Sequence, residues 1–257
     1  MKNTIYLITL IVIVLTASGC RQENVMSAGM KPQSNQPEPS NAPLYSDRIK
    51  NATLLIQVES IQPDGVTMGL DMGTLVQYHG DTYLVTHNHY GEMLGDTNIL
   101  ELRDAQNQLI RTMYGSEFKS LIIYQDPGTL VLRAPEGLTE TLIPVSIDNQ
   151  PQLQSGDIVQ VAYRGGAERD TVEIVDAVIE EITLSKETPV YQLRFPNGQL
   201  LSPGDSGGGV WYGGTLVGNN WLILMIQTIE VSSGTIQPAS ETQTPWSYAA
   251  ILPDIFR

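Results

Sequence analysis

The sequence predicts an all-β protein, built as a β-sandwich or as barrels, behind a polar N-terminal segment. Two observations support this class. Glycine (23) and proline (15) are frequent among the 257 residues, and short apolar segments follow one another closely with turn-forming residues between them. The hydrophobic fraction of 41% is ordinary for a globular protein. Periodicity alone does not decide between a sandwich and a barrel.

The first residues have the pattern of an export signal. Lys2 precedes an apolar run from Ile5 to Leu15, and the small residues 17–19 come before Cys20. A charged start, a short apolar middle and small residues before a cleavage site are typical of a secretory signal. The run is too short to span a bilayer comfortably. We expect residues 1–19 to be a signal peptide.

The end of this signal, Leu15 to Cys20, resembles the lipobox of bacterial lipoproteins, with Ala17 where leucine is commoner. The resemblance implies that Cys20 is lipidated and becomes the mature N-terminus, anchored to the cell membrane outside the cytoplasm. A plain signal peptide with a chance cysteine is the alternative. Since Cys20 is the only cysteine, an extracytoplasmic body must fold without an internal disulfide.

A tether is expected over residues 20–45. Four prolines lie there among Ser, Asn, Gln and Glu. Such a composition buries too little apolar surface to order the chain, so the segment predicts a flexible, partly extended spacer.

Strand candidates fill the rest of the chain. The segments 74–78 and 82–86 flank His79-Gly80-Asp81 and predict a hairpin. Only the end, around residues 246–255, suggests a short helix. The other candidates in chain order are 52–58, 98–102, 109–114, 120–124, 130–133, 157–163, 171–184, 190–195, 209–211, 215–217 and 222–228.

The charge balance excludes one class of partner. The formal net charge is −14 and no basic stretch stands out. An acidic chain repels phosphate backbones, so nucleic acid is not an expected partner. The acidity itself indicates solubility.

The most specific chemical signal is Gly204-Asp205-Ser206-Gly207-Gly208. A serine hydroxyl needs a base and oxyanion donors to act as a nucleophile. Glycines around it allow a tight turn whose N–H groups converge on one point. The alternative is a glycine-rich hairpin loop with an ordinary serine.

Two of the three histidines, His87 and His89, follow the strand candidate 82–86. They could be structural, or a His-x-His zinc pair. Apart from His79, no further histidine and no cysteine cluster accompany them, so we expect no metal site.

Asp126 lies between two apolar segments, 120–124 and 130–133. A carboxylate in this position could fix the tautomer of a histidine. Taken by itself, the pattern favours an ordinary turn aspartate before Pro-Gly, which is common in any protein. Asp96 and Asp104 are rivals, but neither precedes so clear an apolar strand.

Together, the three signals resemble the chymotrypsin-like (trypsin-like) serine peptidases, which carry His, Asp and Gly-Asp-Ser-Gly-Gly motifs in this order. Thr86-His87-Asn88-His89 matches the first motif. The resemblance therefore implies His89 as the catalytic histidine, Asp126 as the acid and Ser206 as the nucleophile. Segments 69–78 and 214–218 also match strands of the family.

The fold that the resemblance implies is two packed antiparallel β-barrels with a short C-terminal helix. The peptidase domain would cover residues 46–257, with an N-terminal barrel over about 46–140 and a C-terminal barrel over about 141–257. The backbone N–H groups of Gly204 and Ser206 would form the oxyanion hole. No metal or organic cofactor is required.

The resemblance also places a substrate pocket in the segments before and after the serine. Leu200 stands where trypsin-like specificity would require an acid, so an apolar preference is expected over Arg or Lys. In some members a freed N-terminus activates the enzyme by pairing with the acid before the serine, here Asp205. A lipidated, tethered start makes that route unexpected. The pocket candidates are Leu200, Leu201, Pro203 and Trp221.

The expected function is a monomeric, membrane-anchored serine endopeptidase that cleaves a peptide or protein substrate. A catalytically silent relative that binds peptides at the cell surface is one alternative. A different β protein with chance motifs is the other.

Overall fold

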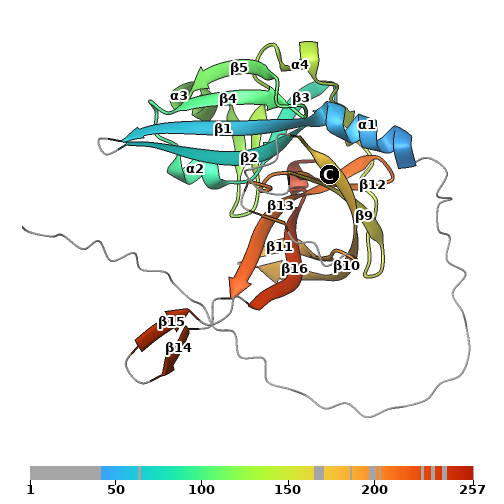
Figure 1. Cartoon of the computed structure of the whole chain (residues 1–257). Coiled ribbons are helices and arrows are strands. Elements are labelled where there is room, and N and C mark those ends of the chain that lie inside the picture. Colours follow the sequence, from blue (N-terminus) through green and yellow to red (C-terminus); the bar gives the residue numbers. More distant parts are fainter. Residues whose placement is uncertain are drawn as a thin grey trace, which may run out of the picture. The chain divides into compact units, whose positions relative to one another are not determined.

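A computed structural model describes residues 42–62, 65–164, 171–185, 187–196, 201–202, 204–226, 229–232, 235–238 and 242–256. β-strands dominate these residues, and they form an eight-stranded sheet, a closed six-stranded barrel and a separate two-stranded ribbon (Figure 1). The all-β prediction is confirmed.

The eight-stranded sheet contains the first half of the chain. Its strands are joined in the order β5-β4-β1-β2-β3-β7-β6, and β8 adds to β2 in parallel. Three short helices connect them: α2 (His89–Met93), α3 (Gly115–Ser120) and α4 (Leu138–Thr141). The strands are β1 (Thr53–Gln62), β2 (Gly65–Tyr78), β3 (Asp81–Thr86), β4 (Ile99–Asp104), β5 (Leu109–Tyr114), β6 (Ile122–Gln125), β7 (Leu130–Arg133) and β8 (Val145–Ser146).

The predicted hairpin is β2–β3. Tyr78 pairs with Asp81, so the connection is a two-residue turn at His79 and Gly80. Both have positive φ, 49° and 90°. Turns of this kind match the twist of the flanking strands, and glycine adopts such a φ without steric cost.

The barrel contains the second half. Its strands close in the order β10-β11-β16-β13-β12-β9. The segments 215–217 and 222–228, expected as separate strands, belong to one long strand, β13. The barrel strands are β9 (Ile158–Tyr163), β10 (Glu173–Ser185), β11 (Thr188–Arg194), β12 (Gly209–Tyr212), β13 (Thr215–Ile226) and β16 (Thr242–Ile251), and the ribbon is β14 (Ile229–Ser232) with β15 (Thr235–Pro238).

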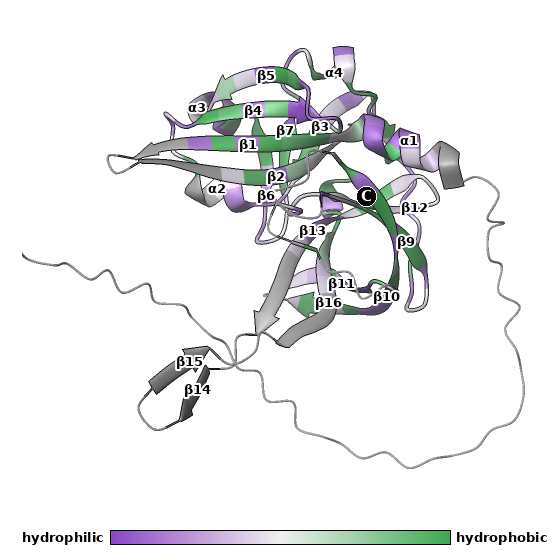
Figure 2. Ribbon diagram, in the orientation of Figure 1, coloured by the Kyte–Doolittle hydropathy of each residue, from purple (hydrophilic) through white to green (hydrophobic). Residues whose placement is uncertain are grey.

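Hydrophobic residues recur along the strands of both sheets (Figure 2). Their buried side chains form three large clusters. One belongs to the eight-stranded sheet and includes Leu75 and Leu84, and one fills the barrel. The third joins the two, because Met72 of β2 and Trp211 of β12 share it. Burial of each such side chain contributes about 1.5–3 kcal/mol. This shared core fixes β2 beside the start of β12.

Helix α1 (Ala42–Ala52) begins inside the predicted tether. Ile49 and Ala52 are fully buried in the shared core, which explains why this part of the chain is ordered. The rest of the tether, the predicted signal peptide and Cys20 lie outside the described residues. Among the residues that the structure describes, no helix is long and apolar enough to cross a bilayer.

Three details differ from the expected two barrels with a C-terminal helix. Among the described residues, only the second sheet closes, whereas the first is an open sheet that includes β8 (Val145–Ser146). Residues 246–251 are strand and not helix, because they pair with both β11 and β13. A three-residue 3-10 helix, η2 (Asp254–Phe256), follows Pro253.

Candidate active site

The loop Gly204–Gly208, here called the serine loop, is held between the two sheets. The N–H of Gly207 donates to the carbonyl of Asn220 on β13, and the Asn220 N–H donates to Gly208, both across 2.8 Å. On the other side, the Met72 N–H of β2 donates to the Ser206 carbonyl across 2.7 Å. Ser206 is thereby fixed directly beside β2.

Gly207 allows this close approach. Its φ is +79°, a conformation that residues with a Cβ rarely adopt. A Cβ there would lie 2.1 Å from the Met72 carbonyl oxygen and 2.9 Å from the backbone nitrogen of His87. The loop therefore contacts both β2 and the histidine segment, and only glycine fits between them.

Asp205 is fully buried inside the loop. Its carboxylate accepts from the Arg164 N–H across 2.5 Å and from the Ser202 N–H across 2.6 Å. The Asn220 side chain donates to the Asp205 carbonyl across 3.2 Å. These bonds fix the backbone on which Ser206 stands.

Two N–H groups in the serine loop remain available. Among the described residues, neither the Gly204 N–H nor the Ser206 N–H has a hydrogen-bond acceptor. Gly204 has a φ of +98°, which turns the chain just before the serine. Such donors can stabilise a negatively charged oxygen.

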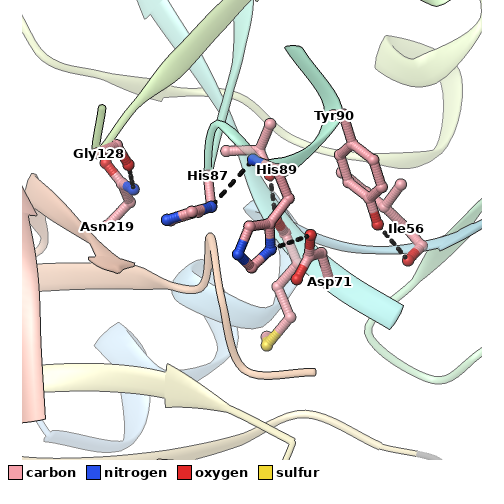
Figure 3. Close-up of polar contacts among 9 residues, drawn as sticks. Ile56, Asp71, His87, His89, Tyr90, Gly128 and Asn219 are labelled. Carbon is pink, nitrogen blue, oxygen red and sulfur yellow. Dashed lines mark hydrogen bonds and ion pairs between the residues drawn. The ribbon is translucent and has the colours of Figure 1, made fainter. Parts of the chain in front are cut away.

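His89 pairs with Asp71, an aspartate on β2 that the sequence did not indicate. The His89 Nδ1 lies 3.4 Å from the Asp71 Oδ2 (Figure 3). The His89 side chain is 49% exposed, whereas that of Asp71 is 5% exposed. A solvent-facing imidazole is thus backed by a buried carboxylate, next in sequence to Met72, which holds Ser206.

The surroundings of Asp71 set its charge. Burial raises the pKa of Asp71 above its ordinary value, while His89 and the Tyr90 hydroxyl lower it. Tyr90 is itself buried and also donates to the Ile56 carbonyl across 3.3 Å. Its own pKa is raised by burial and by Asp71. The carboxylate therefore depends on these two partners to remain ionised.

Both carboxylate oxygens of Asp126, which was predicted as the acid of the triad, accept hydrogen bonds from neighbouring residues. Its Oδ1 accepts from the N–H groups of Gly128 and Thr129 across 2.8 and 2.7 Å, and its Oδ2 accepts from the Tyr124 hydroxyl across 2.9 Å. Burial and the Asp126 carboxylate raise the pKa of Tyr124 to about 12. The carboxylate thus closes its own Asp-Pro-Gly turn, and a turn aspartate is the alternative that the sequence left open.

The register of the hairpin could have revealed Asp71. Gly73 pairs with Thr86 in β2–β3, so continuing that register places residue 71 opposite the segment that follows Thr86. Asp71 is also an acid within the largely apolar segment 69–78, and a buried unpaired carboxylate is rare. The two signals together indicate a partner among the histidines.

His87 lies on the other side of His89. It is 4% exposed, and its ring centroid is 4.0 Å from that of His89 at an interplanar angle of 57°. Its Nδ1 accepts the His89 backbone N–H across 3.0 Å. Burial, assisted by repulsion from His89, lowers the pKa of His87 to about 3.

The predicted pocket residues are only partly described. Leu201 is 4% exposed and packs in the barrel core, and Trp221 is 7% exposed and packs with Val190 and Ala250. Leu200 and Pro203 lie outside the described residues. In the described part of the chain, no group of three or more His, Cys, Asp or Glu side chains could hold a metal ion.

The arrangement can perform acid–base chemistry at a serine. An imidazole whose Nδ1–H faces a carboxylate keeps Nε2 as its basic atom. Ser206 is anchored to the same strand, and two backbone donors lie in its loop. Neither the protein-family models nor the curated proteins compared with the chain match it.

Proposed function

We propose that the protein is a serine endopeptidase of the chymotrypsin-like class, with Ser206 as nucleophile, His89 as general base and Asp71, in place of Asp126, as the orienting acid. The observation that supports this best is that one stretch of β2 contacts both reacting groups. Asp71 pairs with His89, and Met72 holds Ser206.

In the first step, the His89 Nε2 would take the proton of the Ser206 hydroxyl as its oxygen attacks the scissile carbonyl. Asp71 would keep the Nδ1–H of His89 directed at its carboxylate and stabilise the imidazolium that forms. Burial makes this interaction stronger than it would be in water. His89 then gives its proton to the leaving amine.

The tetrahedral intermediate carries a negative oxygen. The N–H groups of Gly204 and Ser206, which have no acceptor among the described residues, would donate to it. Water then attacks the acyl-enzyme, again with His89 as base, and releases the second product. No step needs a metal ion or an organic cofactor.

The predicted location belongs to the same proposal. Lipidation of Cys20 would anchor the enzyme outside the cytoplasm, and the residues between Cys20 and α1 would separate it from the membrane. The closed barrel and the eight-stranded sheet, with the serine loop between them, are compatible with the chymotrypsin-like class.

Labelling with a fluorophosphonate probe tests the chemistry directly. The full-length chain should be labelled, and S206A and H89A should not. D71N should be labelled far more slowly, whereas D126N should react like the wild type. Absence of labelling in a folded wild-type protein would contradict the proposal. Loss of labelling in D126N but not in D71N would restore Asp126 as the acid.

A further inference from the structure

His87 is placed where it can act on His89 and not on a substrate. Figure 3 shows its ring between Asn219 and His89, on the side of His89 away from Asp71. The side chain is buried, at 4% exposure. A substrate therefore cannot reach the His87 ring from solvent.

The hydrogen bond from His89 fixes the tautomer of His87. The His89 backbone N–H donates to the His87 Nδ1 across 3.0 Å, so that nitrogen carries a lone pair and the proton of the neutral ring is on Nε2. With a pKa lowered to about 3 by burial and by His89, His87 remains neutral at physiological pH. It does not compete with its neighbour for a proton.

The other ring nitrogen, Nε2, lowers the stability of the fold, so stability by itself does not explain a histidine at this position. Nε2 is buried and has no hydrogen-bond partner among the described residues. An aliphatic side chain would fill the same space without burying an unsatisfied polar group. Among the described residues, the one hydrogen bond of the His87 ring that offsets this cost is the one that Nδ1 accepts from the His89 backbone N–H.

That contact satisfies a donor that helix geometry leaves open. His89 is the first residue of α2, and the first N–H groups of a helix have no partner within it. Asn88, in the capping position, forms no capping bond with its side chain. His87 thus replaces the missing cap and fixes the backbone from which the His89 ring projects.

We propose that His87 is a positioning residue, whose Nδ1 holds the His89 backbone so that the His89 imidazole stays directed at Asp71. The inference rests on the proposed function, because it assigns His87 a role in the same reaction. His87 itself touches neither the substrate nor the transferred proton.

Two variants separate the acceptor from the bulk of the ring. H87N keeps an acceptor close to the position of Nδ1, and H87L keeps volume without any acceptor. H79N is the matched control, since His79 lies in the β2–β3 turn with a φ of 49° that asparagine tolerates. All three are made in the full-length chain.

The first readout is labelling by the fluorophosphonate probe as a function of probe concentration. H87L should lower the maximal labelling rate about tenfold while the half-saturating concentration stays unchanged, because orientation and not binding is lost. H87N should recover the rate to within about threefold. H79N should match the wild type.

The second readout does not require activity. Hydrogen exchange of the His89 amide, followed by NMR, should be faster in H87L than in the wild type and should remain slow in H87N. Equal labelling of H87L and wild type, or failure of H87N to exceed H87L in either readout, would overturn the inference. An unlabelled wild type would instead overturn the proposed function and this inference with it.

Discussion

The backbone N–H of Met72 donates to the carbonyl of Ser206 across 2.7 Å, one residue after Asp71. This bond crosses from the eight-stranded sheet to the loop that enters the barrel. The Ser206 carbonyl thus binds the peptide N–H that directly follows Asp71, and the Asp71 carboxylate lies 3.4 Å from His89 Nδ1. Strand β2 therefore contacts both Ser206, through Met72, and His89, through Asp71.

Replacing Asp71 with asparagine should abolish most activity. Asparagine offers its Nδ2–H groups as well as its oxygen to His89, so the imidazole can bind in the wrong tautomer, and the imidazolium loses its counter-charge. The rate of fluorophosphonate labelling should fall roughly 10³-fold or more, as expected for loss of a triad carboxylate. The rate constants of D71N and wild type, measured at the same pH, provide the test, and a loss below about tenfold would count against Asp71.

The same variant should be more stable than the wild type near neutral pH. Burial raises the pKa of Asp71 above 3.8, so the folded protein takes up this proton more readily than the unfolded chain. The stability that the carboxyl contributes is present below pH 3.8 and is lost as the pH rises through the raised value. Asparagine does not titrate.

Urea denaturation at about pH 3.5 and about pH 7.5 checks the sign of this effect. The stability of D71N should exceed that of wild type at the higher pH, and the difference should shrink at the lower pH. D157N is a suitable control, because Asp157 lies in a turn of the barrel and its carboxylate accepts from the exposed Gln154 N–H across 2.8 Å. A wild type that is more stable than D71N at neutral pH would show that the carboxylate is not strained by burial.

Asp126 should matter for stability and not for catalysis. Its carboxylate accepts from Gly128, Thr129 and Tyr124, and D126A removes all three bonds. The free energy of unfolding should fall by about 1–3 kcal/mol, the range for loss of hydrogen bonds to a charged group. Labelling of the folded variant should stay within a few-fold of wild type. A labelling defect as large as that of D71N would contradict the assignment.

The sequence predicted most of the strands and singled out His89 and Ser206, because both predictions depend on short local patterns. Alternation and turn residues locate β3, β5 and β7, and the motifs around His89 and Ser206 are short. The identity of the acid is less well determined by local pattern. An aspartate before an apolar strand can orient a histidine or close its own turn, and the local pattern of Asp126 fits both.

The closure of the barrel could not be predicted in the same way. β13 pairs with β12 through a short turn, but β16 joins β11 and β13 from positions distant in sequence. Such long-range pairings depend on the cluster that fills the barrel, to which Tyr191 of β11 and Ala249 of β16 belong.

Asn220 should be the side chain on which the serine loop most depends. Its Nδ2 donates to the carbonyls of Ala162 and Asp205 across 3.0 and 3.2 Å, at 1% exposure. N220A would leave two buried carbonyls without this donor and should cost about 2–4 kcal/mol. Urea unfolding measures this loss, and N51A, which changes an exposed residue at the end of α1, should be nearly neutral. An equal effect of the two variants would argue against this role.

Gly207 offers the sharpest test of how closely the serine loop approaches β2. In G207A, the new Cβ would lie 2.1 Å from the Met72 carbonyl oxygen, and the backbone would keep a φ of +79°. In G80A, the φ of +90° is also unfavourable, but nothing lies within 4 Å of the new Cβ. The two variants share the backbone strain and differ in the contact.

G80A should therefore cost about 1–2 kcal/mol, the penalty for a left-handed residue with a Cβ. G207A should cost at least about 2 kcal/mol more and abolish labelling, because the loop must withdraw from Met72 and carry Ser206 away from His89. Urea denaturation and probe labelling of both variants measure the two effects. If G207A were no less stable than G80A and still labelled, the serine would not depend on its contact with β2, and the site proposed for this protein would have to be rebuilt without that strand.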